Sequence, residues 1–298
     1  MYLVVAGMAE NLVMGTRLRT SLCDLIGIDY PILSVGFGVA AGPELVAAVS
    51  NAGGFGVLGA TGMSPDQIIS RIARTRQLTN RPFGINFIIA ESESDSDEDR
   101  AFLHEEVAAS ADERVAAIVP FWGDPAPYLE QAHRKGVKVF IQVGSVEEAR
   151  AAAEAGVDAV IAQGVEAGGH VRGTTSVWEL LPATIATVEP LPVIASGGIG
   201  DDAGIARALV LGAQGVSLGT PFVASEEAWL HPAYEQRIVT APPKTLSSTS
   251  CTTSGGPALR IERFATRRLR NGIAPAGHRT ASDRAKGRRS AGGTRFRD

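Results

Sequence analysis

Short apolar runs alternate with amphipathic stretches along most of the chain. Eight apolar runs are present, at residues 31–34, 55–59, 83–89, 116–122, 138–143, 159–164, 192–198 and 215–222. The stretches between them, such as 64–78, 145–156 and 201–213, place apolar residues at the spacing of an amphipathic helix. Each run is short and almost continuously apolar, which is typical of a strand buried on both faces. The pattern therefore predicts a parallel sheet covered by helices.

Eight strand–helix units are the number that closes a (β/α)8 barrel. We expect this barrel to occupy residues 17–243 of the 298-residue chain, because one such domain needs ~250 residues. An open, doubly wound sheet is the alternative that the pattern leaves. Residues 1–16 are expected to be a disordered leader, with Met14 as an alternative start, and residues 244–298 a separate tail.

The composition narrows the class of protein. With 45% hydrophobic residues the chain is too apolar to be disordered. Two cysteines, Cys23 and Cys251, supply neither a disulfide framework nor metal-ligand spacing, which favours a reducing, cytoplasmic location and no bound metal. The apolar N-terminal run lacks a basic flank and is too short to span a bilayer, so we expect neither a signal peptide nor a membrane partner.

An acidic run follows the third apolar run. Residues 91–99 hold six acidic side chains in nine positions. This density favours a solvated loop that charge repulsion keeps open. A mobile lid beside the mouth of the barrel is the alternative, and both interpretations are compatible with the sequence.

Glycine turns follow the last two apolar runs. Ser196, Gly197 and Gly198 offer a hydroxyl and two unobstructed N–H groups, and Gly219 with Thr220 offers another such set. In barrels of this type, the loops after the last two strands commonly bind a phosphate. Converging main-chain donors without side-chain bulk are what an anion requires. The two turns therefore predict a phosphate site, with plain turns as the alternative.

One histidine lies among glycines after the run at 159–164. His170 follows Gly164, Gly168 and Gly169 and precedes Gly173. Histidine titrates near neutrality and can exchange a proton at working pH, while glycines leave room for a flat ligand. A loop histidine bonded to a backbone carbonyl is an equally good interpretation of this stretch taken alone.

Several motifs in order resemble the nitronate monooxygenase family, formerly called 2-nitropropane dioxygenases. They are Q-G-x-E-A-G-G-H at 163–170, P-V-I-A-S-G-G-I at 192–199 and L-G-A-x-G-V-x-L-G-T-x-F at 211–222, with P-F-G-I-N-F at 82–87 and Q-V-G-S-V-E-E-A at 142–149. The resemblance implies an FMN-binding TIM barrel that oxidises alkyl nitronates with O2 to a carbonyl compound and nitrite. The A-G-G-H phrase also occurs in NAD(P)H-dependent flavin enoyl-acyl-carrier-protein reductases, so that activity is the enzyme alternative. A flavin-binding relic without turnover is the non-enzyme alternative.

The resemblance also implies roles for individual residues. His170 matches the histidine beside the flavin, a candidate base or hydrogen-bond donor to the nitro group. The other matching positions are expected to bind the cofactor: Asn86, Gln163, Gly164 and Gly169 at the flavin ring, and Ser196, Gly197, Gly198, Gly219 and Thr220 at the FMN phosphate. Gln142 is a further candidate to face the flavin. The expected partners are a small nitronate and O2, without nucleic acid, and the oligomeric state is not readable.

Two segments depart from the family pattern. After the run at 31–34 the family has an apolar A-P-M segment, whereas this chain continues with Val35, Gly36 and Phe37. The tail is the second departure, because residues 244–298 show neither helical nor strand periodicity. The tail also carries 13 Lys and Arg against 3 Asp and Glu, while residues 1–243 carry 15 against 29.

A change of reading frame explains the tail best. Read one nucleotide earlier, with permitted synonymous codons, residues 255–265 become G-W-P-G-A-P-H-R-A-L-R, which is similar to a C-terminal segment of the family. We therefore hypothesise a frameshift near Lys244 and a non-native tail, which the nucleotide sequence tests. A basic nucleic-acid arm is the competing interpretation, but the arginines lack the interleaved aromatic residues expected of one.

Overall fold

The computed structural model describes residues 18–89, 96–240, 246–251 and 259–264, all within one compact unit. The predicted leader 1–16 lies outside the described residues, as does most of the tail. The domain limits predicted from the sequence therefore stay predictions.

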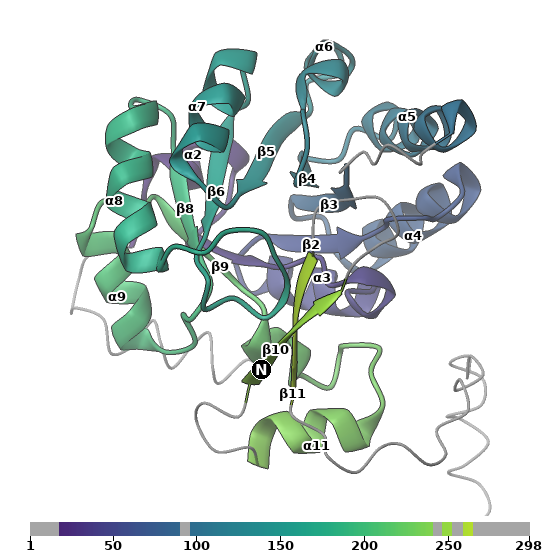
Figure 1. Ribbon diagram of the computed structural model, residues 1–298. Helices are drawn as coiled ribbons and strands as arrows, with labels where there is room; N and C mark the ends of the chain where they lie inside the picture. Colours follow the sequence, from purple (N-terminus) through teal and green to yellow (C-terminus); the bar gives the residue numbers. More distant parts are fainter. Residues whose placement is uncertain (1–17, 90–95, 241–245, 252–258, 265–298) are drawn as a thin grey trace, which may run out of the picture. The chain divides into compact units, whose positions relative to one another are not determined.

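Eight parallel strands form a nearly closed barrel, which confirms the predicted fold (Figure 1). The strands are β1 (Ile32–Ser34), β2 (Gly56–Gly59), β3 (Phe83–Ile88), β4 (Ala117–Phe121), β5 (Lys138–Val143), β6 (Ala159–Gln163), β8 (Val193–Ser196) and β9 (Gly215–Leu218). Their spatial order is β1-β9-β8-β6-β5-β4-β3-β2. A bridge between Leu33 and Phe55 brings the two outer strands together. Each strand lies within one of the eight apolar runs.

Helices connect consecutive strands and surround the barrel. They are α3 (Pro43–Asn51), α4 (Pro65–Leu78), α5 (Asp97–Asp112), α6 (Ala126–Arg134), α7 (Val146–Ala155), α8 (Val177–Val188) and α9 (Asp202–Val210), with the short η1 (Gly38–Ala40) after β1 and α10 (Thr220–Val223) and α11 (Pro232–Thr240) after β9. Several helices begin where the sequence supplies an N-cap. At α4, for example, the Ser64 hydroxyl accepts from the Gln67 N–H while the Gln67 side chain accepts from the Ser64 N–H.

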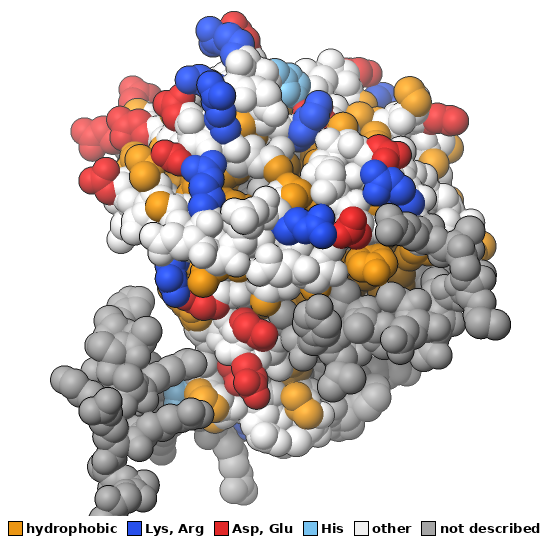
Figure 2. All heavy atoms as spheres, turned by 180° about the vertical axis from the view of Figure 1, so that it is seen from behind, with side chains coloured by type: hydrophobic (Ala, Val, Ile, Leu, Met, Phe, Trp, Pro, Cys, Tyr) orange, Lys and Arg blue, Asp and Glu red, His pale blue; other side chains and the backbone are white. Residues whose placement is uncertain are grey.

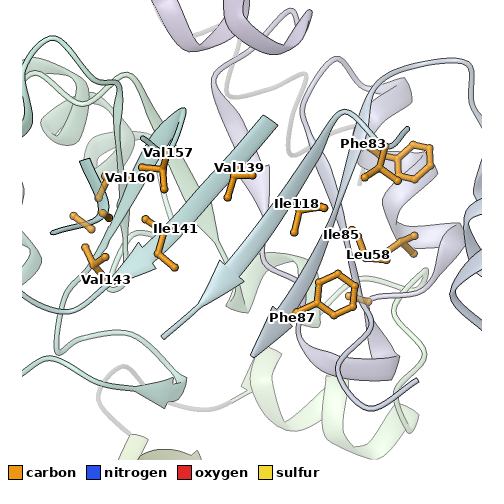
Figure 3. Packing of buried hydrophobic residues seen from close by; sticks show 14 of the residues in the cluster. Leu58, Phe83, Ile85, Phe87, Ile118, Val139, Ile141, Val143, Val157 and Val160 are labelled. Atoms are coloured by element: carbon orange, nitrogen blue, oxygen red, sulfur yellow. The ribbon is translucent and has the colours of Figure 1, made fainter. Parts of the chain in front are cut away.

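Two apolar layers separate the inside of the barrel from the outside. Along β5, Val139 and Ile141 pack outward in the cluster that the helices share, and Figure 3 shows part of this layer. Phe140, between them, belongs to the interior cluster. Successive side chains of a strand point to opposite faces, so Gln142 points into the barrel with Phe140.

A helix before β1 closes one end of the barrel. In α2 (Ser21–Ile26), Leu22 and Cys23 are fully buried and belong to the interior cluster. The Thr20 hydroxyl donates to the Gln214 carbonyl, just before β9 begins. Because α2 lies at the N-terminal ends of the strands, it leaves the C-terminal ends for a site.

Charged side chains of both signs are interspersed over the outside of the barrel (Figure 2). Exposed ion pairs such as Arg74–Glu44 and Arg81–Asp29 join neighbouring elements. Each exposed pair contributes about 1 kcal/mol or less. The outward apolar layer therefore holds the helices on the sheet much more than these pairs do.

The structure differs from the sequence predictions in three places. Residues 96–99 of the acidic run belong to the start of α5, where Ser96 is the N-cap and acids suit the positive end of the helix dipole. Residues 90–95 lie outside the described residues. The run at 215–222 is divided between β9 and α10.

The third difference concerns elements that periodicity did not indicate. A short strand, β7 (Gly169–Val171), pairs antiparallel with β11 (Leu259–Phe264), which pairs antiparallel with β10 (Leu246–Cys251). Two of these strands lie in the aperiodic tail. Strand pairing is made by backbone groups and needs no period of side chains, so the pattern could not show it.

Candidate functional site

Polar side chains gather where the strands end. Asn86, Gln142, Gln163, Ser196 and Ser217 continue the inward-facing positions of β3, β5, β6, β8 and β9. Four of them are buried, with exposed fractions of 3–8%, and Asn86 is half-buried. The barrel interior thus changes from apolar to polar towards the C-terminal ends of the strands, where such barrels carry their sites.

Gln163 has a buried amide of which only one half is satisfied. Its Nε2 donates to the carbonyl of His170 at 2.9 Å. Its Oε1 is buried and has no hydrogen-bond partner. An unpaired buried carbonyl costs about 1–3 kcal/mol, so this oxygen calls for an N–H or O–H donor from a bound molecule.

The chain after β1 lies directly over Asn86. A Cβ added at Gly36 would stand 2.6 Å from the Cβ of Asn86, and one added at Gly59 would stand 2.1 Å from the carbonyl oxygen of Gly38. The Asn86 amide donates to the Val119 carbonyl at 2.7 Å, which fixes its orientation against β4. The segment at residues 35–37, which departs from the family pattern, therefore covers Asn86.

The two glycine turns lie on neighbouring strands. Ser196 on β8 is in register with Ser217 on β9. Gly197 and Gly198 have φ of +99° and +65°, values that side chains rarely adopt. A Cβ added at Gly219 would approach nothing closer than Val35, at 3.9 Å. Thr220 is exposed at the start of α10. The main chain of Gly219 thus borders open space at the end of β9, whereas a Cβ added at Gly198 would stand 2.8 Å from the Cβ of Glu166.

The turn after β6 packs too tightly for side chains. A Cβ at Gly164 would stand 2.3 Å from the Val177 N, and one at Gly197 would stand 2.9 Å from the Ala167 N. The Gly164 N–H donates to the Ser196 carbonyl at 2.9 Å. The turn at 164–167 and the glycine turn at 196–198 therefore pack directly against each other.

Glu166 anchors the same turn to α8. Its carboxylate accepts from the Val177 N–H at 2.9 Å and from the Ser176 hydroxyl, so it satisfies N-terminal donors of the helix. The sequence motif contains this glutamate, but its structural role could not be predicted from the motif alone. An acidic residue shortly before a predicted helix was the available signal.

His170 stands on β7 with Gly169 beside it in a left-handed conformation, φ +76°. The side chain is exposed, and its ring lies 6.5 Å from the ring of Phe121 at the end of β4. Partial burial lowers the pKa of His170 below its ordinary value of 6.5. The imidazole is therefore neutral near pH 7, and one ring nitrogen can accept a proton.

A cluster that sequence analysis missed lies beside His170. The guanidinium of Arg172 lies over the Trp122 ring, 4.6 Å from its centroid. Arg172 Nε donates to Glu148, and the other Glu148 oxygen accepts from the Gly144 N–H at 2.8 Å. Trp122 directly follows β4, Glu148 is in the first turn of α7, and Arg172 follows β7. Their separation along the chain left no pattern that could have found them.

The predicted residues thus form one connected region. Gln163 contacts His170, Gly164 contacts Ser196, and the chain that crosses Asn86 reaches Gly219 through Val35. Within the residues that the structure describes, no group of three or more His, Cys, Asp and Glu side chains is placed to hold a metal ion. No described helix combines the length and apolar character needed to cross a membrane.

Comparisons with known proteins show the family to which the chain belongs. A family model described as nitronate monooxygenase matches residues 19–295. A probable nitronate monooxygenase of Staphylococcus saprophyticus is 33% identical over 284 residues, which cover 83% of this chain and 79% of the relative.

Two further relatives have other names. The "(3aS,4S,5R,7aS)-5-hydroxy-7a-methyl-1-oxo-octahydro-1H-indene-4-carboxyl-CoA dehydrogenase" of Rhodococcus jostii is 36% identical over 213 residues, 72% of this chain. The chain spans 57% of the length of that relative. The solved structure of FabK from Thermotoga maritima is 37% identical with a TM-score of 0.75, covering 84% of this chain and 75% of that one.

Proposed function

Because the chain belongs to the nitronate monooxygenase family, we propose that it uses FMN and O2 to oxidise alkyl nitronates to a carbonyl compound and nitrite. When bound, FMN would supply the redox chemistry, and the protein would supply binding, orientation and proton positioning.

The residues present fit FMN at both of its ends. The N–H groups of the left-handed turn at Gly197 and Gly198, together with the open space beside Gly219, would hold the phosphate, with the hydroxyls of Ser196 and Thr220 as further donors. The flavin ring carries N–H as well as carbonyl groups. Gln163 and Asn86 would therefore hold its edge. Gly169, which has nothing within 4 Å of its Cβ position, would leave room for its plane, and Gly164 would border the ring with its main chain only.

His170 would act on the substrate. A nitronate is an anion whose charge is spread over the two nitro oxygens, and a neutral imidazole can donate one N–H to such an oxygen. With a neutral nitroalkane as substrate, the same ring would accept the proton from carbon. Phe121 supplies an apolar surface beside the ring, and Gln163 keeps the His170 backbone in place.

One observation carries this proposal. The buried Gln163 amide uses its N–H2 group to hold His170 and leaves its oxygen without a partner. One side chain therefore both holds the residue proposed to transfer the proton, His170, and presents a buried oxygen that needs a hydrogen-bond donor. An N–H group of a bound flavin would satisfy the Gln163 oxygen.

A His170→Asn variant tests the proposal. It should retain about one FMN per chain, because His170 lies outside the glycine turns, and it should lose 10²–10⁴-fold in kcat/KM, the usual contribution of a general acid or base. For the wild type, kcat/KM with a neutral nitroalkane should rise with pH through a pKa below 6.5. His104→Asn is the matched control, since His104 packs on Tyr128 in the outer helices. Normal nitronate turnover by His170→Asn contradicts the assignment.

The second candidate is NAD(P)H-dependent reduction of an enoyl thioester. Two comparisons favour it: a relative named for a carboxyl-CoA substrate at 36% identity, and FabK at 37%. Anaerobic mixing of the FMN-loaded chain with NADH, NADPH or ethylnitronate separates the candidates, because only the true reductant bleaches the flavin absorbance. Bleaching by none of the three would favour a flavin-binding relic.

A further inference from the structure

Three side chains from different loops meet beside the His170 strand: Trp122, Glu148 and Arg172. We call them the clamp. Trp122 follows β4, Glu148 lies in the first turn of α7, and Arg172 follows β7. None of the three belongs to the glycine turns proposed for FMN. Their contacts must therefore serve something other than the phosphate.

Trp122 is held in an unusual backbone conformation. Its φ is +56°, in the left-handed region that non-glycine residues rarely adopt, and its exposed fraction is 9%. Gly123 continues with φ +136°, and a Cβ there would stand 2.5 Å from the Ile89 carbonyl oxygen. A strained, buried conformation persists only where the surroundings determine it, and such positions cluster at functional sites. Here the conformation presents the indole face to Arg172.

Glu148 fixes Arg172 to the end of β5. One carboxylate oxygen binds Arg172 and the other binds the Gly144 N–H. Gly144 and Gly173 approach so closely that a Cβ on Gly173 would stand 2.3 Å from the Gly144 carbonyl oxygen. The segment that carries Arg172 is therefore held by side chain and main chain alike.

His170 lies on β7, and Arg172 directly follows this strand. Residues two apart on extended chain point the same way, and the two contacts agree: His170 lies near Phe121 and Arg172 on the adjacent Trp122. The Gln163 amide also donates to the carbonyl of His170. Fixing Arg172 therefore restricts where the imidazole can stand.

We propose that Trp122, Glu148 and Arg172 are positioning residues that hold the imidazole of His170 in its reactive place. Capture of an anionic substrate by Arg172 is disfavoured, because Glu148 already neutralises the guanidinium. The kinetic part of the inference rests on the proposed function. A misplacement of about 1 Å can cost about 10²-fold in rate, so loss of the clamp should be visible in kcat.

Arg172→Ala, in the full-length FMN-loaded chain, is the principal test, and Arg207→Ala is its matched control. The Arg207 guanidinium stacks on Trp178 at 3.9 Å, between α8 and α9. We expect Arg172→Ala to retain FMN and to lose on the order of 10- to 100-fold in kcat with ethylnitronate, with little change in KM. Arg207→Ala should change neither quantity.

NMR titration of the imidazoles supplies a readout that does not depend on turnover. The His170 signal is identified by its disappearance in His170→Asn. In Arg172→Ala the ring should gain water, and the His170 pKa should move up towards its ordinary value of 6.5. Glu148→Gln, a milder change that leaves one oxygen for two donors, should lower kcat in the same direction and alter the His170 titration, and it serves if Arg172→Ala fails to fold.

The outcomes separate the inference from the proposed function. Unchanged kcat and an unchanged His170 titration in both variants would overturn the clamp. A raised KM with normal kcat, rescued by Arg172→Lys, would overturn it in favour of anion capture. If the wild type does not oxidise nitronates, the proposed function fails, but the titration still reports whether Arg172 positions His170.

Discussion

The half-satisfied amide of Gln163 yields a prediction with two opposing parts. Gln163→Met removes the hydrogen bond to the His170 carbonyl, which costs about 0.5–1.5 kcal/mol. It also removes a buried oxygen without a partner, which relieves about 1–3 kcal/mol in the chain without flavin. The two nearly cancel, so the free energy of unfolding of the apoprotein should change by about 1 kcal/mol or less.

Flavin binding should respond differently. If the ring of FMN supplies the donor to Gln163 Oε1, the variant loses that bond, and about 1.4 kcal/mol corresponds to a tenfold weaker Kd. Quenching of FMN fluorescence during titration measures Kd, and urea unfolding of the apoprotein measures stability. The expected signature is a tenfold loss of affinity without a loss of stability.

Gln214→Met is the matched control. Its Oε1 accepts from the Ser21 N–H and hydroxyl, at 3.2 and 2.8 Å, at the opposite end of the barrel. This variant should destabilise the apoprotein by about 1–2 kcal/mol and leave the FMN Kd unchanged. The reasoning is refuted if the FMN Kd of Gln163→Met equals that of the wild type. It is also refuted if Gln163→Met lowers the free energy of unfolding of the apoprotein as much as Gln214→Met does.

Two more predictions concern carboxylates to which no role in flavin binding is assigned. Burial raises the pKa of Glu106 to about 7, although N–H bonds from Met63 and Gly62 oppose the shift. The folded chain then binds more protons than the unfolded chain between pH of about 4.5 and 7, so its unfolding free energy should fall across that window by up to about 3 kcal/mol. Urea unfolding at several pH values should show this fall for the wild type and a flatter profile for Glu106→Gln; parallel profiles would count against it. Glu166→Ala should cost about 1–2 kcal/mol, because it removes the acceptor of the Val177 N–H at the start of α8, whereas Glu179→Ala, at an exposed position within α8, should cost under 0.5 kcal/mol.

Some of this protein follows directly from the order of its residues. The eight strands lie where the apolar runs predicted them, because a strand buried on both faces must be apolar at nearly every position. The turns at Gly197 and Gly198 have the positive φ for which glycine is suited. His170 could be chosen as a candidate because it lies in the loop after a strand, at the end of such a barrel that carries the site, whereas Gln163 was chosen from the resemblance to the family.

Contacts between residues that are far apart in the sequence could be seen only in the tertiary structure, because the closed barrel brings them together. Trp122, Glu148 and Arg172 lie in different units, and nothing in the local sequence relates one to another. The start of α5 inside the acidic run and the pairing of β7 with β11 depend likewise on capping and backbone bonds rather than on hydrophobic period. Periodicity records which face of each element is buried, whereas the partners of a loop side chain are set by how the strand ends meet in space.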